Sequence, residues 1–590
     1  EMWDVGFDTH TPRGEDAREA FDMAMDMGPG GFDQLGSDQI FEMAGSMDAT
    51  GFDMLGGDAV FDMAMGMDSA QFGNMEGDQL AGMFGAMEGD MMYDLGGDML
   101  FDAASNMGAS DFYAMDQDAA FGMFDAMGPD MIMDLGGDQM AGMLGAMEGD
   151  MMYDLGGDML FDAASTMGAN DFMMMDPDSA FGMFDAMGPE MVFDLGGDQM
   201  AGMFSAMEGE QIRGMDADMA FGAFESIGAG GFDMLGGEQM VGMFDAMAPE
   251  MMYDLGGDML FDAASTMGAN DFMMMDHDAA FGMFDAMGPD MIMDLGGDQM
   301  AGMFSAMEGD MFMDIGGDML FDAASTMGAQ DFMMMDHDAA FGMFDAMGPD
   351  MIMDLGGDQM AGMFSAMEGD MFMDIGGDML FDAAAGMGAQ DFMMMDHGAA
   401  FGMMDAMGFD AVKDLGGEQM AGMFGAMEGD QLGAMGAERA FDAMMDMGMG
   451  TAMEFMGGDQ MAGMLGAMEG DMFGAFGGDM LFDAAMNMGA QDMMGMPPEA
   501  AFGMVETMGF DMMLELPGDA MAGMFGAMEG DMFSQMGGDV LFDAAMSMGA
   551  QDMMMMPPEA AFGMFDTMGQ GAVMDLPPDA MAGMFGAMEG

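Results

Sequence analysis

The sequence predicts an all-α protein: an α-solenoid, or superhelix, of about 29 tandem 20-residue repeats, each built from two short helices. Three observations lead to this prediction. Similar segments recur every 20 residues, which is the signature of a repeat architecture. Apolar residues within each segment have the spacing of one helical face. Met, Ala and Leu fill those positions, whereas the β-branched residues that favour strands are few.

The repeats cover nearly the whole chain. A lead-in of residues 1–15 precedes 22 repeats at 16–456, and 7 further repeats occupy 457–590 after a one-residue phase shift, the last of them incomplete. A longer period of 60 residues is superimposed on part of the array, because three repeat types alternate. They are type A (296–315, GGDQMAGMFSAMEGDMFMDI), type B (316–335, GGDMLFDAASTMGAQDFMMM) and type C (336–355, DHDAAFGMFDAMGPDMIMDL).

An acidic residue at position 3 marks the start of the first helix in 27 of the 29 repeats. A carboxylate there would cap backbone N–H groups or face the positive end of the helix dipole. Apolar residues follow at positions 5, 8, 9 and 12, as in Ala340, Met343, Phe344 and Met347. Gly or Glu-Gly at positions 13 and 14 ends this helix, and a second acid such as Asp350 introduces a shorter helix with apolar positions 16, 17 and 20.

A β-solenoid is the competing architecture for a 20-residue repeat. It would require alternating Val, Ile, Thr and Tyr, and the helical spacing of Met, Ala and Leu favours helices instead. Helices of two or three turns are unstable alone in water. Stacking of each repeat on its neighbours must therefore supply the stability, as in other solenoids.

Two C-terminal segments carry a family resemblance. Met556–Met568 (MPPEAAFGMFDTM) and Leu576–Phe585 (LPPDAMAGMF) resemble the Leu-Pro-Pro-Glu repeats in the cytoplasmic N-terminal domain of MgtE-type magnesium channels, which is similar to the FliG helical repeats. The resemblance implies a superhelix of short helices and an acidic, Mg²⁺-responsive surface. The chain departs from the family in having no CBS module, no channel segment and far more Gly, so no cation-binding residue of the family is transferred.

The charge balance limits the partners. Asp and Glu number 111 and Lys and Arg only 5, for a formal net charge of −106. Such a chain cannot neutralise phosphates, which excludes nucleic acid and anionic lipid surfaces, and no apolar run is long enough for membrane insertion. Divalent cations and basic proteins remain as partners. An extracellular or cell-surface location is favoured, or a cytoplasmic one if the magnesium-channel resemblance holds.

No catalytic constellation is present, so we expect a non-enzymatic protein. There is no Cys, and Lys413 is the only lysine. His277, His337 and His397 recur one 60-residue period apart, too far from one another to share a metal or a reaction centre. Each occupies position 2, where other repeats have Gly, Pro, Ala or Gln, and is therefore interpreted as a neutral turn residue.

Carboxylates at the turns between helices are the candidate metal ligands. An acid at position 19 stands four residues before the position 3 acid of the next repeat, and Gly-Gly often follows it. The pairs are Asp94 with Asp98, Asp134 with Asp138, Asp294 with Asp298, and Asp354 with Asp358. Two carboxylates, nearby carbonyls and water are hard oxygen ligands for Mg or Ca, although diffuse counterion binding is the alternative. Neither an EF-hand loop nor a calcium β-roll repeat is present.

Methionine provides a second hypothesis. Runs such as 273–275 and 333–335 place thioethers close together, and soft sulfur selects Cu(I). Methionine at positions 8, 12 and 16 is interpreted as core filler, because Leu would normally stand there. Positions 18 and 19 should be partly exposed. The alternative function is therefore a Met-rich module that binds a soft metal or a protein partner.

Overall fold

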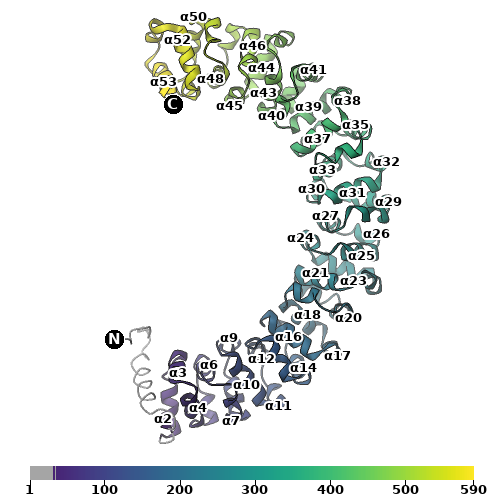
Figure 1. The fold of residues 1–590 in the computed structure, drawn as a ribbon, viewed down its shortest axis with the longest axis vertical. Helices are drawn as coiled ribbons and strands as arrows, with labels where there is room; N and C mark the ends of the chain where they lie inside the picture. The colour runs from purple at the N-terminus through teal and green to yellow at the C-terminus, as the bar shows by residue number, and fades with distance from the viewer. Residues whose placement is uncertain (1–30, 33–34, 590) are drawn as a thin grey trace. The chain divides into compact units, whose positions relative to one another are not determined.

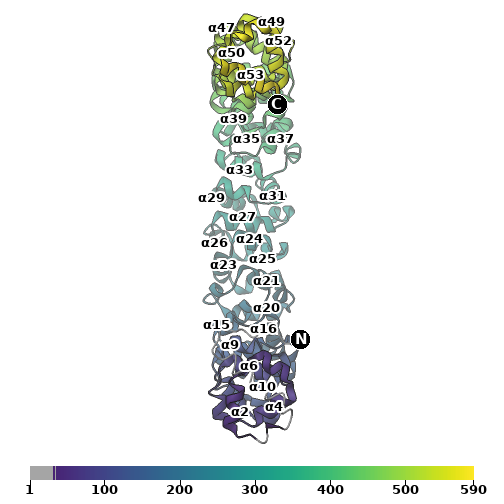
Figure 2. The same cartoon turned by 90° about the vertical axis from the view of Figure 1, so that its left-hand side faces the viewer.

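The computed structural model describes residues 31–32 and 35–589, so the expected lead-in at 1–15 lies outside the described residues. The chain divides into two compact halves, 1–295 and 296–590. All regular elements among the described residues are α-helices or 3₁₀-helices, and none is a strand. In each half the helices succeed one another in chain order along a stack (Figure 1 and Figure 2). The predicted all-α solenoid of tandem short helices is confirmed.

Each repeat contains a long first helix and a short second one. The alternation runs from α2 (Ser37–Ala44) to α53 (Pro578–Glu589). A representative stretch of the first half is α6 (Gly77–Gly85), α7 (Met91–Leu95), α8 (Gly97–Ala104), α9 (Ala109–Phe112), α10 (Gln117–Met127), α11 (Pro129–Ile132), α12 (Gly137–Gly145), η2 (Gly149–Met151), α13 (Met152–Leu155), α14 (Gly157–Thr166), α15 (Ala169–Phe172) and α16 (Pro177–Met187).

The second half follows the same plan. Its first helices are α27 (Gly297–Ala306), η4 (Gly309–Met311), α28 (Phe312–Ile315), α29 (Gly317–Thr326), α30 (Ala329–Met333), α31 (His337–Met347), α32 (Pro349–Ile352), α33 (Gly357–Ala366), α34 (Phe372–Ile375), α35 (Gly377–Gly386), α36 (Ala389–Phe392), α37 (His397–Met407) and α38 (Phe409–Val412). The long helices begin at position 2 of the repeat. Within this half, α30 and α33 lie along one edge of the stack, and α29, α32 and α35 along the other (Figure 1).

Side chains at the first positions of the repeat fix where the long helices start. In type C repeats the position 1 acid is the N-cap: the Asp336 carboxylate accepts the N–H of Asp338 at 3.0 Å. In type A repeats the Gln at position 4 caps the start of the helix instead: Gln359 Oε1 accepts the N–H of Gly356 at 2.9 Å. The position 3 acids lie in the first turn, where their charge faces the positive end of the helix dipole.

Two glycines per triplet make turns that other residues disfavour. Gly348 ends α31 with φ of 73°, and Gly316 separates α28 from α29 with φ of 92°. Residues with a β-carbon rarely adopt these angles. A single glycine therefore joins the long α31 to the short α32, and another joins the short α28 to the long α29.

The predicted apolar face forms the core. Ala340, Met343, Phe344 and Met347 are all buried, as their spacing predicts. The ring of Phe344 contacts that of Phe364 in the next repeat, with centroids 5.8 Å apart. Successive long helices also contact one another where a type B repeat has Ala at position 9, as α29 contacts α31, so the core is continuous within each half.

Each long helix also packs closely on the second helix found two repeats earlier. A β-carbon built on Gly342, at position 7, would lie only 2.5 Å from the carbonyl oxygen of Gly309, at position 14. The first half repeats this contact between Gly122 and Gly89. In the usual triplet order, the position 7 Gly of a type C repeat packs on the position 14 Gly of a type A repeat. The position 7 Gly of a type A repeat packs on the position 14 Ala of a type B repeat. Type B repeats have Asp there, and Asp162, Asp322 and Asp382 belong to repeats whose partner two repeats earlier has Pro at position 14, as where α14 contacts α11.

Candidate functional site

The acidic residues lie at the surface. The buried polar residues among those the structure describes are Gln71, Gln79 and Ser179, and no Asp or Glu is among them. Asp245 is largely covered, since only 3% of its side chain is exposed. The high negative charge is therefore presented to solvent along the stacked repeats of each half.

The predicted aspartate pairs occupy the expected turns. Asp94 is near the end of α7 and Asp98 is in the first turn of α8, with Gly96 between these helices. Asp354 follows α32, and Asp358 is in the first turn of α33. Asp134 and Asp138 have the same placement between α11 and α12, whereas Asp294 and Asp298 belong to different halves of the chain. All eight residues are exposed.

A pocket of about 760 Å³ shows how these acids are grouped. It is lined by Asp378 and Asp382 from α35, and by Asp414, which follows α38. By position in the triplet, Asp98 corresponds to Asp378 and Asp134 to Asp414, and α8 contacts α11 as α35 contacts α38. Packing of the repeats therefore brings together acids that the sequence assigned to two different pairs. It also brings in the position 7 acid, here Asp382, which was not predicted as a site residue.

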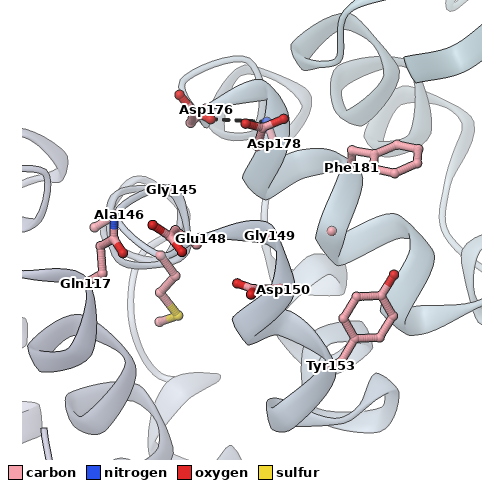
Figure 3. A pocket seen from close by; sticks show the side chains of 12 residues that line it. Gln117, Gly145, Ala146, Glu148, Gly149, Asp150, Tyr153, Asp176, Asp178 and Phe181 are labelled. Atoms are coloured by element: carbon pink, nitrogen blue, oxygen red, sulfur yellow. Dashed lines mark hydrogen bonds between the residues drawn. The ribbon is translucent and has the colours of Figure 1, made fainter. Parts of the chain in front are cut away.

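The second acidic pocket lies in the first half and has a volume of about 650 Å³. Figure 3 shows Glu148 and Asp150 on the turn after α12, and Asp176 and Asp178 where α16 begins. Gln117 lines the same pocket. These four carboxylates come from repeats whose sequence recurs along the chain, so the arrangement is a property of the array.

Histidines of the second half stand at the position of Gln117. His337 Nδ1 contacts the carbonyl oxygen of Ala366, and its Nε2 lies 3.7 Å from the carboxylate of Glu368. His397 makes the equivalent contact with Ala426. The histidines thus connect the start of one long helix to the end of the next, which agrees with a role as turn residues.

No group of three or more His, Cys, Asp or Glu side chains within the described ranges is arranged to hold a metal ion. An ion at the turn pockets would therefore take few direct ligands from the protein, and water would complete its shell. In the same part of the chain, no helix is both long and apolar enough to cross a bilayer.

The three basic residues of the described chain stand where the triplet order is broken. Twice a single repeat separates two type A repeats: 216–235 and 436–456. Beside the first break, the Arg213 guanidinium contacts Glu210 at 2.8 Å and Asp245 at 2.7 Å. Burial raises the pKa of the Asp245 carboxyl, while the Asp276 N–H and Arg213 oppose this shift.

Lys413 and Arg439 belong to the second break. The Lys413 ammonium contacts Asp442 at 3.0 Å and Asp446 at 3.6 Å, and the hydrogen bond to Asp442 raises the pKa of this lysine. Arg439 lies over the ring of Phe409, 5.7 Å from its centroid. Each break is thus accompanied by local pairing of a Lys or Arg side chain with acids.

Methionines divide into a buried and an exposed class. In the run at 333–335, Met335 is only 4% exposed, whereas Met333 is 39% and Met334 43% exposed. Methionine at positions 8 and 12 is buried, as predicted for core filler, and positions 18 and 19 are exposed, as expected. The prediction is wrong for position 16, where Met351 is only half-buried, because the short helix turns position 17 (Ile352) into the core. Among the described residues, the large apolar side chains that are exposed are Met, Tyr and Phe, and include no Leu, Ile or Val.

Comparison with known proteins places the chain in no family. No family model matches it, and no curated protein does. A structure of the karyopherin Kap121p bound to the extreme C-terminus of the phosphatase Cdc14p is similar at 9% identity and a TM-score of 0.19, over 98% of this chain and 78% of that one. Kap121p bound to Ste12p gives 9% identity and a TM-score of 0.20, over 98% and 69%. TM-scores this low carry no argument about function.

Proposed function

We propose that this chain is a non-enzymatic acidic scaffold that binds divalent cations, Mg or Ca, through carboxylates around its inter-helix turns. One observation supports this most: the carboxylates are exposed and recur in open pockets such as the one lined by Asp378, Asp382 and Asp414. The 5 basic residues of the chain cannot balance 111 acids, so mobile cations must do so.

The chemistry of the pockets fits weak, repeated binding. Carboxylate and carbonyl oxygens are hard ligands, and Mg²⁺ commonly keeps several waters while one or two carboxylates hold it. A bound divalent ion supplies positive charge between like-charged side chains. Binding to the folded form alone stabilises it by about 2.7 kcal/mol per site at a hundredfold excess over Kd. Many such sites would make the stability of the array depend on divalent ions.

Thermal unfolding at matched ionic strength tests the proposal. We expect a higher midpoint in MgCl₂ or CaCl₂ than in NaCl, because monovalent salt relieves repulsion only by screening. Replacing the three pocket acids Asp378, Asp382 and Asp414 by Asn should remove part of this difference.

The matched control removes three exposed acids that do not line that pocket: Asp345→Asn, Glu506→Asn and Asp566→Asn. It reduces the net charge by the same amount, so it should retain the difference between the two salts. Equal midpoints in NaCl and in the divalent salts would reject specific ion binding and leave diffuse screening.

A second candidate, soft-metal binding, is favoured by the exposure of the adjacent Met333 and Met334. Thioether sulfur selects Cu(I), so these residues would give a stoichiometric Cu(I) signal. Changing Met333, Met334 and Met335 together to Leu should abolish one binding equivalent and leave the divalent-cation response intact. An unchanged Cu(I) titration would remove this candidate.

A further inference from the structure

The exposed side chains at positions 18 and 19 of the type B repeats are nearly all methionine, and in each half they are here called the methionine row. Its members stand at positions 18 and 19 and are Tyr113, Met173, Met174, Met273 and Met274 in the first half, and Met333, Met334, Met393, Met394, Met554 and Met555 in the second. In the second half, α30, which ends at Met333, lies on the edge of the stack opposite to α29 and α32 (Figure 1).

Two contacts of the first half link residues that are one 60-residue period apart. The Tyr113 hydroxyl donates to the carbonyl of Met174, 61 residues further on. The Arg213 guanidinium donates to the carbonyl of Met274 over the same sequence separation, at 3.3 Å. Position 18 of one triplet thus lies beside position 19 of the next. In the second half, Met333 and Met394 stand at the same two repeat positions and have the same sequence separation.

The small residues under the row explain its exposure. The ring of Tyr113 lies where a β-carbon of Gly145 would be, and the side chain of Met494 lies in the same way against Gly526. At these two places the position 18 side chain therefore rests on a glycine of the type A repeat, whereas the corresponding residue for Met333 is Ser365. The outer surface of the position 18 side chains stays uncovered by other parts of the same half.

The charge around the row selects its partner. No Lys or Arg occurs between Arg213 and Lys413, and exposed acids such as Asp336 and Asp396 stand two residues after the methionine pairs. A second copy of this chain, or an anionic membrane surface, would be repelled. Unbranched thioether side chains adapt to differently shaped apolar groups, which suits peptide recognition.

We infer that the methionine row is a docking surface for a basic amphipathic polypeptide segment of another protein. The apolar side chains of that segment would lie on the thioethers, and its Lys and Arg side chains would pair with the flanking aspartates. This inference does not depend on cation binding at the turns, since the row and the turn pockets use different residues.

The test uses the full chain and a defined probe, an amphipathic Lys/Leu peptide of about 20 residues, which is about 30 Å long as a helix. The variant changes Met333, Met334, Met393 and Met394 to Gln, leaving the charge unaltered. The matched control changes four exposed methionines outside the row to Gln: Met313, Met353, Met373 and Met480. We expect the row variant to bind the peptide about tenfold more weakly than the control variant does.

Two further measurements keep the result interpretable. A Lys/Ser peptide of equal charge should bind wild type and both variants alike, because it reports electrostatics alone. Methionine oxidation of the unmodified chain, read by mass spectrometry, should be slowed by the Lys/Leu peptide at Met333, Met334, Met393 and Met394 but not at Met313 or Met373. Equal weakening in both variants, or protection spread evenly over all exposed methionines, would overturn the inference.

Discussion

Replacing Gly342 by Ala should destabilise the repeats around α31, although Ala is the better helix former. The new β-carbon would lie 2.5 Å from the Gly309 carbonyl oxygen and 2.7 Å from its Cα. Because ordinary β-carbon contacts begin at 3.4 Å, the two backbones must separate by about 0.9 Å. Overpacking of this kind costs about 1–3 kcal/mol, against a helix-propensity gain of at most about 1 kcal/mol. We expect a net loss of about 1–2 kcal/mol.

Hydrogen exchange measured by mass spectrometry gives the assay, because solenoid repeats open locally and report their own stability. Faster exchange should be concentrated in η4, α28 and α31. The control is Gly450→Ala in α42 (Met449–Phe455), where a β-carbon meets nothing within 4 Å, so this change should slow exchange locally. If Gly342→Ala protected its region as well as Gly450→Ala does, the close packing of positions 7 and 14 would be refuted.

Two further predictions concern charge pairing. Arg213→Met should cost about 2 kcal/mol, because it leaves the Asp245 side chain, 3% exposed, without its cation. Removing Arg213 should also raise the pKa of Asp245 further, so the melting temperature of the variant should fall further below that of wild type as the pH rises from 4 to 7. Lys413→Met is the comparison, and its melting temperature should fall less because the partners of Lys413 are half-exposed. Equal losses of melting temperature in the two variants would contradict this reasoning. The Asp125 hydrogen bond raises the pKa of Tyr93 to about 12, which stabilises the fold up to about pH 10 and is lost as the pH rises through 12. In an absorbance titration, Asp125→Asn should return one tyrosine toward its ordinary pKa of about 10, and an unchanged curve would reject the bond.

The sequence predicted the fold because one pattern recurs with few exceptions. Ala340, Met343, Phe344 and Met347 show helical spacing in a single repeat, and all four are buried in the structure. Because the same spacing recurs in nearly every repeat, it predicted helices along the whole array. In α32 the second helix begins at position 14, so its position 15 acid, Asp350, lies inside the first turn instead of before it.

The grouping of the acids could not be predicted in the same way. Asp94 and Asp98 are neighbours in sequence, and a single chain without a structure suggests only such local pairs. The contact between α8 and α11 depends on how repeats stack, which involves residues some 30 positions apart. The recurrence of Asp at position 7 in type B repeats, as in Asp382, was the available signal for the third acid.

The contact between position 14 of one repeat and position 7 of the repeat two places on also determines how this array can change in length. Adding or deleting a whole triplet preserves every pairing of a small residue with Gly, and every pairing of Pro with Asp. Inserting one extra type B repeat would instead set the Gly at position 14 of type A against an Asp. The protein can therefore be lengthened by whole 60-residue triplets without changing these contacts. At the two places where a single repeat interrupts the order, Arg213 and Lys413 bridge neighbouring acids.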